Sequence, residues 1–379
     1  MDFDLNDEQR MLKDSVDRLM RDNYAFETRK KYIKEPTGYS TEMWDQYAEM
    51  GLLGLPFGEQ YGGSGGGCVE TMIVMEAMGR GLTLEPYFST VILGGGLLRL
   101  AGNDQQKSNL LPAIASGELK LAFAHGEMQS RYDLTDVALS ARRDADGWIL
   151  NGDKCAVVHG GVADKLIVSA RTSGNRRDAD GITLFIIDAK AAGVSRKDYQ
   201  THDSLRSADI KLANLKVSSS DELGPVGRAA PILREVADRA LAASAAESVG
   251  AMAEAYDITL EYLKTRKQFG ATIGSFQALQ HRAVDMLVSV EQARSMAYYA
   301  TMMADNANAE ERRNAIAAAM VQIRRSARHV CQQAVQLHGG IGMTIEYKVG
   351  HYFKRITALE SLFGDLDHHL AVVSKAGRV

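Results

Sequence analysis

A single carboxylate in an alanine-rich segment is the first residue whose type and position suggest acid–base chemistry. Between Ala240 and Ala253, Glu247 is the only charged residue, and apolar positions recur there at helical spacing. A carboxylate buried on such a helix is unfavourable unless it is paired or protonated, and a general base is often held in that kind of environment. Because glutamate is seldom buried, a partly exposed residue on a good helix former is the alternative interpretation.

A second chemical signal is the glycine-dense segment LPFGEQYGGSGGG, residues 55–67, which precedes an apolar helix-forming segment. Glycine allows the backbone to approach a ligand or another backbone closely, so these residues could cradle a phosphate group. The P-loop pattern GxxxxGK[ST] is absent, and no GxGxxG follows a clear strand. The segment therefore predicts a close backbone approach and not a recognisable nucleotide motif.

Composition and charge argue against several classes of partner. The chain has 379 residues and a formal net charge of -4, with acidic and basic residues interspersed, which does not suggest nucleic acid or an anionic membrane. No uncharged apolar run approaches about 18 residues, and the first segment is polar and acidic, so we expect a cytoplasmic protein without a membrane span. The three cysteines are far apart and show no metal-ligand spacing, so no metal site is predicted.

The period of the apolar residues divides the chain into three parts. Residues 1–118 read as amphipathic helices, whereas residues 119–228 contain short strand-like runs separated by Gly, Asp and Asn turn signals. Residues 229–379 return to helical periodicity. A chain of this length is expected to form two or three domains, and the middle part predicts a small antiparallel barrel or sandwich between helical parts.

Six motifs in the same order resemble those of the FAD-dependent acyl-CoA dehydrogenases, over essentially the whole chain. The resemblance implies an N-terminal helical domain, a middle antiparallel β-barrel and a C-terminal four-helix bundle that pairs subunits, with FAD between them. Within the family, the chain looks most like the small subunits of pimeloyl-CoA-type bacterial dehydrogenases. The motifs are LPFGEQYGGSG (55–65), GEMQSRYD (126–133), NGDKCAVVHGG (151–161), LRSAD (205–209, expected as a turn), RKQFGATIGSFQALQHRAVDM (266–286) and QLHGGIG (336–342).

The resemblance also implies which residues bind the cofactor. Arg266, Phe269 and Gln277 would contact the pyrophosphate and adenosine of the FAD held by a neighbouring subunit, and Gln336 and Gly340 would shape the same dinucleotide site. Arginine can bind phosphate oxygens in a bidentate manner, and glycine lets backbone N–H groups come close. A cation at the C-terminal end of a helix is the simpler interpretation of Arg266, and both can hold together.

Three positions depart from the family pattern. The tryptophan and threonine that the family places beside the flavin ring are Ala156 and Val158 here. Val158 has no hydroxyl to donate to flavin N5, so only backbone groups could do so, and the lost tryptophan suggests a different contact with the electron acceptor. The usual C-terminal catalytic glutamate is replaced by Phe363. Phenylalanine cannot take a proton, but its backbone N–H could still hydrogen-bond a thioester carbonyl.

Glu247 is the residue that we expect to supply the missing base. A few branches of the family place the base at the position of Ala240, and Glu247 lies close to two helical turns further on, at a displacement of roughly 10 Å along the same face. A related bacterial group has an Ala-Ala-Glu-x-x-Gly helix similar to AAESVG in this chain. The competing acids are Asp365, which could instead serve a turn or the FAD ribityl chain, and Glu360, which could be a surface charge.

The activity implied is α,β-dehydrogenation of an acyl-CoA to a trans-2-enoyl-CoA, as in fatty acid β-oxidation, with an electron-transfer flavoprotein or a similar acceptor. A homo-oligomer or a hetero-oligomer with a related subunit is expected. One alternative is an FAD-organising, catalytically incomplete subunit of a heteromeric dehydrogenase, and another is a flavin oxidase or monooxygenase on the same fold. Small residues such as Gly250 are expected to widen the acyl cavity, whereas Arg131 would meet a distal carboxylate or lie on the surface.

Overall fold

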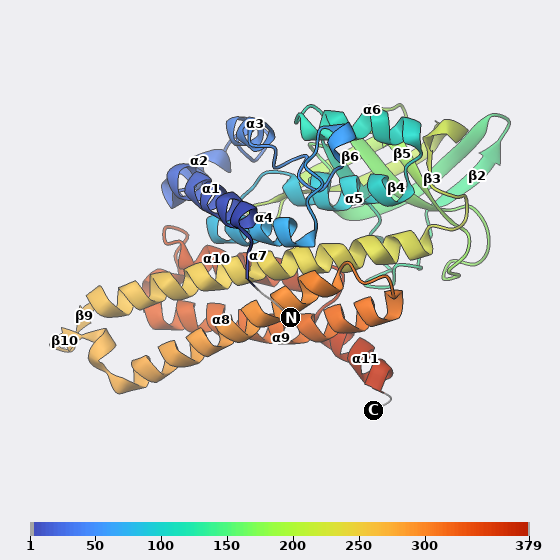
Figure 1. Ribbon diagram of the computed structural model, residues 1–379. Coiled ribbons are helices and arrows are strands. Elements are labelled where there is room, and N and C mark those ends of the chain that lie inside the picture. Colours follow the sequence, from blue (N-terminus) through green and yellow to red (C-terminus); the bar gives the residue numbers. More distant parts are fainter. Residues whose placement is uncertain (1–3, 378–379) are drawn as a thin grey trace. The chain divides into compact units, whose positions relative to one another are not determined.

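A computed structural model describes residues 4–377, and contacts divide the chain into two compact units. The helical unit comprises Met1–Lys31, Cys68–Thr83 and Leu241–Val379, and the sheet unit comprises Tyr32–Gly67 and Leu84–Ala240. The predicted order of helices, strands and helices along the chain is confirmed (Figure 1). Helices from the N-terminal third of the chain belong to both units, so the compact units do not follow the sequence order.

The helical unit is built on three long helices, α7 (Ala230–Thr265, of which the part from Leu241 belongs here), α8 (Gln277–Met303) and α9 (Ala309–His338). A capping box between Asn6 and Gln9 begins the first helix of the unit, because each side chain accepts from the other residue's backbone N–H. The remaining elements are α1 (Asp7–Asn23), α2 (Phe26–Tyr32), α4 (Cys68–Gly81), α10 (Val349–Glu360), α11 (Leu366–Gly377), the hairpin strands β9 (Lys267–Gln268) and β10 (Ala271–Thr272), and the turns η4 (Ile273–Ser275) and η5 (Gly339–Met343).

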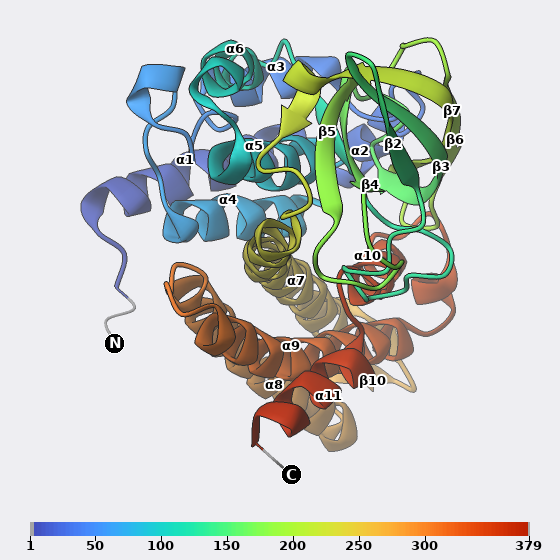
Figure 2. The same cartoon turned by 90° about the vertical axis from the view of Figure 1, so that its right-hand side faces the viewer.

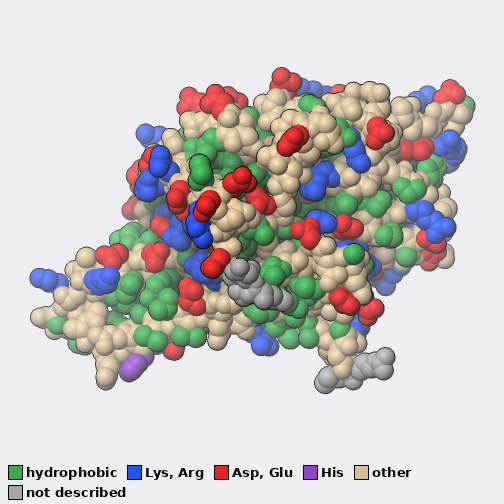
Figure 3. Space-filling model, viewed as in Figure 1, with side chains coloured by type: hydrophobic (Ala, Val, Ile, Leu, Met, Phe, Trp, Pro, Cys, Tyr) green, Lys and Arg blue, Asp and Glu red, His purple; other side chains and the backbone are tan. Residues whose placement is uncertain are grey.

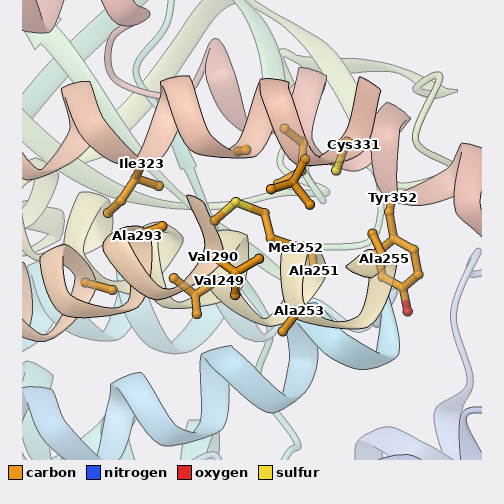
Figure 4. Packing of buried hydrophobic residues seen from close by; sticks show 14 of the residues in the cluster. Val249, Ala251, Met252, Ala253, Ala255, Val290, Ala293, Ile323, Cys331 and Tyr352 are labelled. Atoms are coloured by element: carbon orange, nitrogen blue, oxygen red, sulfur yellow. The ribbon is translucent and has the colours of Figure 1, made fainter. Parts of the chain in front are cut away.

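Small side chains dominate the core of the helical unit, where α7, α8, α9 and α10 meet (Figure 4). Alanines on the helices allow close approach, and longer apolar side chains fill the spaces between them. The labelled core residues in the figure are Val249, Ala251, Met252, Ala253, Ala255, Val290, Ala293, Ile323, Cys331 and Tyr352. The alanine-rich stretch of α7 is therefore a packing surface on one side.

Two glycines bring α4 and α7 into backbone contact. A Cβ added at Gly79 would overlap the carbonyl oxygen of Glu247, and a Cβ added at Gly250 would overlap the carbonyl oxygen of Glu76. The expectation that Gly250 widens an acyl cavity is therefore wrong, because the space beside it is filled by the α4 backbone. Gly250 instead fixes the distance between the two helices, one turn away from Glu247.

Replacing Gly250 with alanine is expected to lower the free energy of unfolding by about 2–3 kcal/mol, because the methyl group forces the α4 and α7 backbones apart. Urea unfolding followed by far-UV circular dichroism measures the change. Gly96→Ala is the matched control: its Cβ would meet only Val236, at 3.9 Å, and Gly96 lies in a helix, so alanine should be neutral or slightly stabilising there. Unchanged stability of Gly250→Ala would contradict the close α4–α7 contact.

The sheet unit carries all strands from β1 to β8, together with short helices. Its core consists of apolar side chains that point inward from the strands, among them Leu150, Leu166 and Phe185. The helices are α3 (Thr41–Glu49), η1 (Glu59–Tyr61), η2 (Phe88–Gly95, a π-helix), α5 (Gly96–Ala101), α6 (Asp104–Ala115) and η3 (Ser219–Asp221). The strands are β1 (Leu121–Ala124), β2 (Ser140–Asp144), β3 (Gly147–Val158), β4 (Lys165–Arg171), β5 (Ile182–Asp188), β6 (Val194–Gln200), β7 (Arg206–Ser218) and β8 (Glu222–Leu223).

These strands form one eight-stranded sheet in the order β6-β7-β3-β2-β4-β5-β8, with β1 added beside β4 (Figure 2). The expected closed barrel is wrong, because β6 and β8 lie at opposite ends of this order and do not pair among the described residues. Closure of a barrel needs two full-length edge strands with a matching stagger, whereas β8 has two residues. The sheet is also not wholly antiparallel, since β1 runs parallel to β4.

Charged side chains of both signs are interspersed on the face of the molecule drawn in Figure 3. This distribution agrees with the small net charge of -4. Within residues 4–377, no helix combines the length and the apolar character that a membrane crossing requires.

Candidate active site

Glu247 is a buried carboxylate with one paired oxygen and one unpaired oxygen. It lies on α7 with 7% of its surface exposed. The Nε of Arg355, on α10, donates to Glu247 Oε1 at 2.6 Å. Oε2 is buried and has no hydrogen-bond partner in the described part of the chain. The arginine therefore fixes the position of the carboxylate, while Oε2 keeps its lone pairs available for a proton.

The charged residues that flank this site on α4 have other partners. Glu76 accepts from Arg294 at 2.5 Å, and Arg80 donates to Glu254 at 3.2 Å. The backbone of α4 at Gly79 lies against the Glu247 backbone, so this side of α7 is closed by main chain. Arg294 and Arg80 thus pair with carboxylates other than Glu247.

The turn after α10 holds Phe363 in the left-handed region, with φ 52. An aromatic residue rarely adopts this conformation, and such strain occurs often at functional sites. No described backbone carbonyl accepts from the Phe363 N–H. The two competing acids are engaged: Asp365 Oδ1 accepts from the His368 backbone N–H at 2.8 Å, as a helix cap does, and Glu360 forms an ion pair with Arg328.

The β9–β10 hairpin presents three of the predicted cofactor residues. Phe269 is 90% exposed, and it shares a two-residue turn with Gly270 in which both φ values are positive. That combination is typical of a type I′ hairpin, where a bulky first residue is unusual. Arg266 and Gln277, at the two ends of this segment, are also exposed. The hairpin therefore displays an aromatic ring and a cation to whatever lies outside the chain.

The structure links the hairpin to the second predicted cofactor segment through Tyr262. The Tyr262 carbonyl accepts from the Arg266 N–H at 2.9 Å, and the Tyr262 ring lies 4.4 Å from the ring of His338. His338 directly precedes η5, in which Gly340 is exposed and has no atom within 4 Å of a Cβ position. Gln336 is exposed as well and helps to line a cavity of about 400 Å³. No sequence signal singled out Tyr262 or His338, although both lie within or beside the quoted motifs.

A buried ion pair anchors the predicted flavin segment of the sheet unit. The Nζ of Lys154 donates to Glu127 Oε1 at 2.7 Å, and both side chains are buried. Burial lowers the pKa of Lys154 to about 8, which leaves it protonated at neutral pH. Burial opposes the ionisation of Glu127, but the Lys154 ammonium outweighs it and holds the Glu127 pKa below its ordinary value. Both residues lie in the quoted motifs, but no sequence signal paired them.

The end of β3 that contains Val158 is irregular. Ala156 has a positive φ of 51, and its N–H donates to Asp209 Oδ1 at 3.1 Å. The Cys155 N–H donates to the Gly126 carbonyl at 2.8 Å, so the predicted flavin segment 151–161 is joined directly to the motif at 126–133. The LRSAD motif was expected as a turn, but it leads into strand β7, where Asp209 reaches the bulge at Ala156. Val158 is partly buried.

Comparisons with known proteins all point to one family. Residues 6–118 match the acyl-CoA dehydrogenase N-terminal domain, residues 122–216 its middle domain and residues 234–377 its C-terminal domain. The caffeyl-CoA reductase-Etf complex subunit CarC of Acetobacterium woodii is 31% identical over 85% of this chain and 86% of its own length.

Two solved structures have the same fold over the whole chain. The structure titled "FAD complex of PigA" has a TM-score of 0.91 at 26% identity and covers 100% of this chain and 99% of its own. The ChsE4-ChsE5 complex from Mycobacterium tuberculosis has a TM-score of 0.87 at 25% identity and covers 100% and 98%. On this evidence, the chain belongs to the acyl-CoA dehydrogenase family.

Proposed function

We propose that this chain oxidises an acyl-CoA thioester to its trans-2-enoyl-CoA, with Glu247 as the base that removes the Cα proton. The observation that supports this role is the arrangement of the carboxylate: Arg355 holds Oε1 at 2.6 Å, and buried Oε2 has no partner. A base whose accepting oxygen is bare and whose position is fixed can take a proton without first breaking a hydrogen bond.

The cofactor is FAD, and five residues of the helical unit suit its parts. Arg266 is an exposed cation for phosphate oxygens, and Gly340 has open space around its backbone, as a close-lying dinucleotide requires. Phe269 offers an exposed aromatic ring to the adenine base of FAD. Gln277 and Gln336 add exposed amides. When bound, FAD supplies the acceptor for the hydride that leaves Cβ.

The remaining residues act on the substrate and on the flavin ring through backbone groups. A Cα proton is weakly acidic unless the developing negative charge on the thioester oxygen is stabilised, and the Phe363 N–H, which has no described backbone acceptor, is suited to donate to that oxygen. Val158 has no side-chain donor, so its contribution at the ring is a backbone group. Asp365 caps α11 with its side chain, so any contact with FAD would add to that role.

We also propose domain limits, an acyl group and an electron acceptor. The domain limits are 1–118, 119–228 and 229–379. The proposed acyl group is a dicarboxylyl chain of the pimeloyl type. Arg131, which is exposed with φ 45 on the loop after Glu127, could meet the distal carboxylate. An electron-transfer flavoprotein is the proposed acceptor, and the complex named for the relative from Acetobacterium woodii supports that choice.

Anaerobic titration of the FAD-loaded protein with a panel of acyl-CoA thioesters is expected to bleach the flavin absorbance and to yield one enoyl-CoA per reduced flavin. The free acids of the same chain length are the control, because without the thioester the Cα proton is not acidified and no bleaching should follow. If no member of the panel bleaches the flavin, whether the chain is alone or with its partner, the proposed reaction is wrong.

A second candidate function is that of an FAD-organising subunit whose partner supplies the base. Two observations favour it: Phe363 stands where the family's usual acid is expected, and the ChsE4-ChsE5 complex has the same fold. Purification of the chain alone and with a related second subunit separates the two cases. Activity that requires the partner and survives Glu247→Gln would support the second function.

A further inference from the structure

The sheet unit contains a buried chain of polar side chains that the proposed reaction does not use. We call Glu127, Lys154, Ser169 and His125 the polar relay. Their exposed fractions are 6%, 1%, 0% and 8%. Four polar groups are rarely buried together unless each hydrogen-bonding atom is satisfied, so the direction of every bond can be deduced from the contacts.

Lys154 sets the direction of the polar relay. Its ammonium group has three hydrogens and no acceptor. It is within reach of three acceptors: Glu127 Oε1 at 2.7 Å, the His125 carbonyl at 3.1 Å and Ser169 Oγ at 3.0 Å. Each hydrogen therefore has its own acceptor, and Ser169 must accept from Lys154.

The serine in turn sets the tautomer of the histidine. Ser169 Oγ lies 2.8 Å from His125 Nδ1, and Ser169 is completely buried with no other acceptor described for its hydroxyl hydrogen. If Nδ1 carried a proton, the hydroxyl hydrogen would be left without an acceptor, at a cost of about 1–3 kcal/mol. Ser169 therefore donates to Nδ1, and the neutral ring carries its proton on Nε2. Burial and the Lys154 charge lower the pKa of His125 to about 3, so the ring is neutral throughout the physiological range.

The Nε2–H group of His125 is thus a permanent donor without a described acceptor. The ring is stacked on Phe123, with centroids 5.2 Å apart and planes 13° apart, which restricts its rotation. The residue keeps 8% of its surface exposed, and Nε2 is not among the buried side-chain atoms that lack a partner, so this nitrogen is accessible from outside the polar relay. A fixed donor of this kind suits a ligand that presents a carbonyl oxygen or an unprotonated ring nitrogen.

We infer that His125 is a flavin-binding residue whose Nε2–H, fixed as a donor by the polar relay, hydrogen-bonds a carbonyl oxygen or ring nitrogen of the FAD isoalloxazine. This inference rests on the proposed use of FAD. His125 adjoins Gly126, whose carbonyl accepts from the Cys155 N–H, so the donor lies beside the segment 151–161 that the resemblance assigns to the flavin. A donor at an acceptor atom of the ring stabilises the negative charge that the ring gains on reduction, and so it favours the reduced cofactor.

The midpoint potential of bound FAD tests the contact. His125→Leu is expected to shift the two-electron reduction equilibrium about tenfold toward oxidised FAD, which corresponds to about 30 mV. His125→Gln retains an N–H donor and should keep a potential close to that of the wild type. Spectroelectrochemical titration of both variants, with FAD content measured in parallel, gives the comparison. Equal potentials for His125→Leu and the wild type would overturn the inference.

A second measurement does not involve the flavin. Long-range 1H–15N NMR of the histidine-labelled protein without FAD should show His125 as the Nε2–H tautomer from neutral pH down to about pH 4, with the signal assigned by its loss in His125→Gln. Ser169→Ala should mix the two tautomers. An Nδ1–H tautomer or an imidazolium near pH 6 would overturn the polar relay. If the relay holds but the protein binds no FAD, the proposed cofactor is wrong, and the inferred flavin contact falls with it.

Discussion

Replacing Glu247 with glutamine is expected to slow the reduction of bound FAD by acyl-CoA about 10³-fold while leaving the FAD content unchanged. The amide has the shape of the carboxylate and can still accept from Arg355 Nε, so the contact of 2.6 Å can persist. It cannot take the Cα proton, because an amide oxygen is a very weak base. Anaerobic stopped-flow absorbance of the flavin, after mixing with a saturating acyl-CoA, measures the rate.

Two matched variants separate the role of a base from a general loss of negative charge. Glu360→Gln and Asp365→Asn remove the competing acids. In the wild type Glu360 forms an ion pair with Arg328, and Asp365 caps α11. Each is expected to reduce FAD within a few-fold of the wild-type rate. If Glu247→Gln matches the wild type while one of these variants is slow, the base has been assigned to the wrong carboxylate.

The fold was predictable from the sequence as far as local patterns reach. Helical periodicity and runs of alternating apolar residues gave the correct order of helices and strands. Barrel closure was wrong, because it depends on how far β6 and β8 extend and whether they meet, and a pattern of period two contains no such information. The role of Gly250 was wrong for a related reason, since a glycine marks a close approach without saying what approaches.

In the candidate site, too, the sequence pattern identified single residues but not their tertiary partners. Glu247 was visible because a lone acid in an alanine-rich helix is chemically unusual. Its partner Arg355 lies 108 positions away in an ordinary amphipathic helix, where an arginine has no reason to be noticed. Lys154 and His125 sit on strands and loops whose charged residues normally face water, and only the tertiary contacts reveal that both are buried.

Lys154→Met is expected to lower the free energy of unfolding by about 3–5 kcal/mol, because it leaves the buried carboxylate of Glu127 without its cation. The lysine also donates to the His125 carbonyl and to Ser169, so two further acceptors lose a donor. Methionine fills a volume similar to that of the lysine stem, which limits the contribution of a cavity. Urea unfolding at neutral pH, monitored by circular dichroism, measures the loss.

The contribution of Glu127 to the free energy of unfolding should depend on pH with opposite signs in the wild type and in Lys154→Met. In the wild type the Glu127 pKa is held below 4.5, so its contribution to stability is present above that value and is lost as the pH falls through the folded-state pKa. In Lys154→Met, burial without a nearby ammonium raises the Glu127 pKa. The variant is then most stable when Glu127 is protonated, and it loses stability as the pH rises from the ordinary glutamate pKa toward the raised folded-state pKa.

The double variant Glu127→Gln/Lys154→Met decides whether the ion pair itself is responsible. Glutamine removes the buried charge, so the double variant should be more stable than Lys154→Met, and the two substitutions should not be additive. Lys264→Met is the surface control. The side chain of Lys264 is 58% exposed and that of its partner Glu261 is 67% exposed, so the free energy of unfolding should hardly change. Additive effects of the Glu127 and Lys154 substitutions, or a pH slope with the wild-type sign in Lys154→Met, would show that the cluster is stabilised by packing and not by its charges.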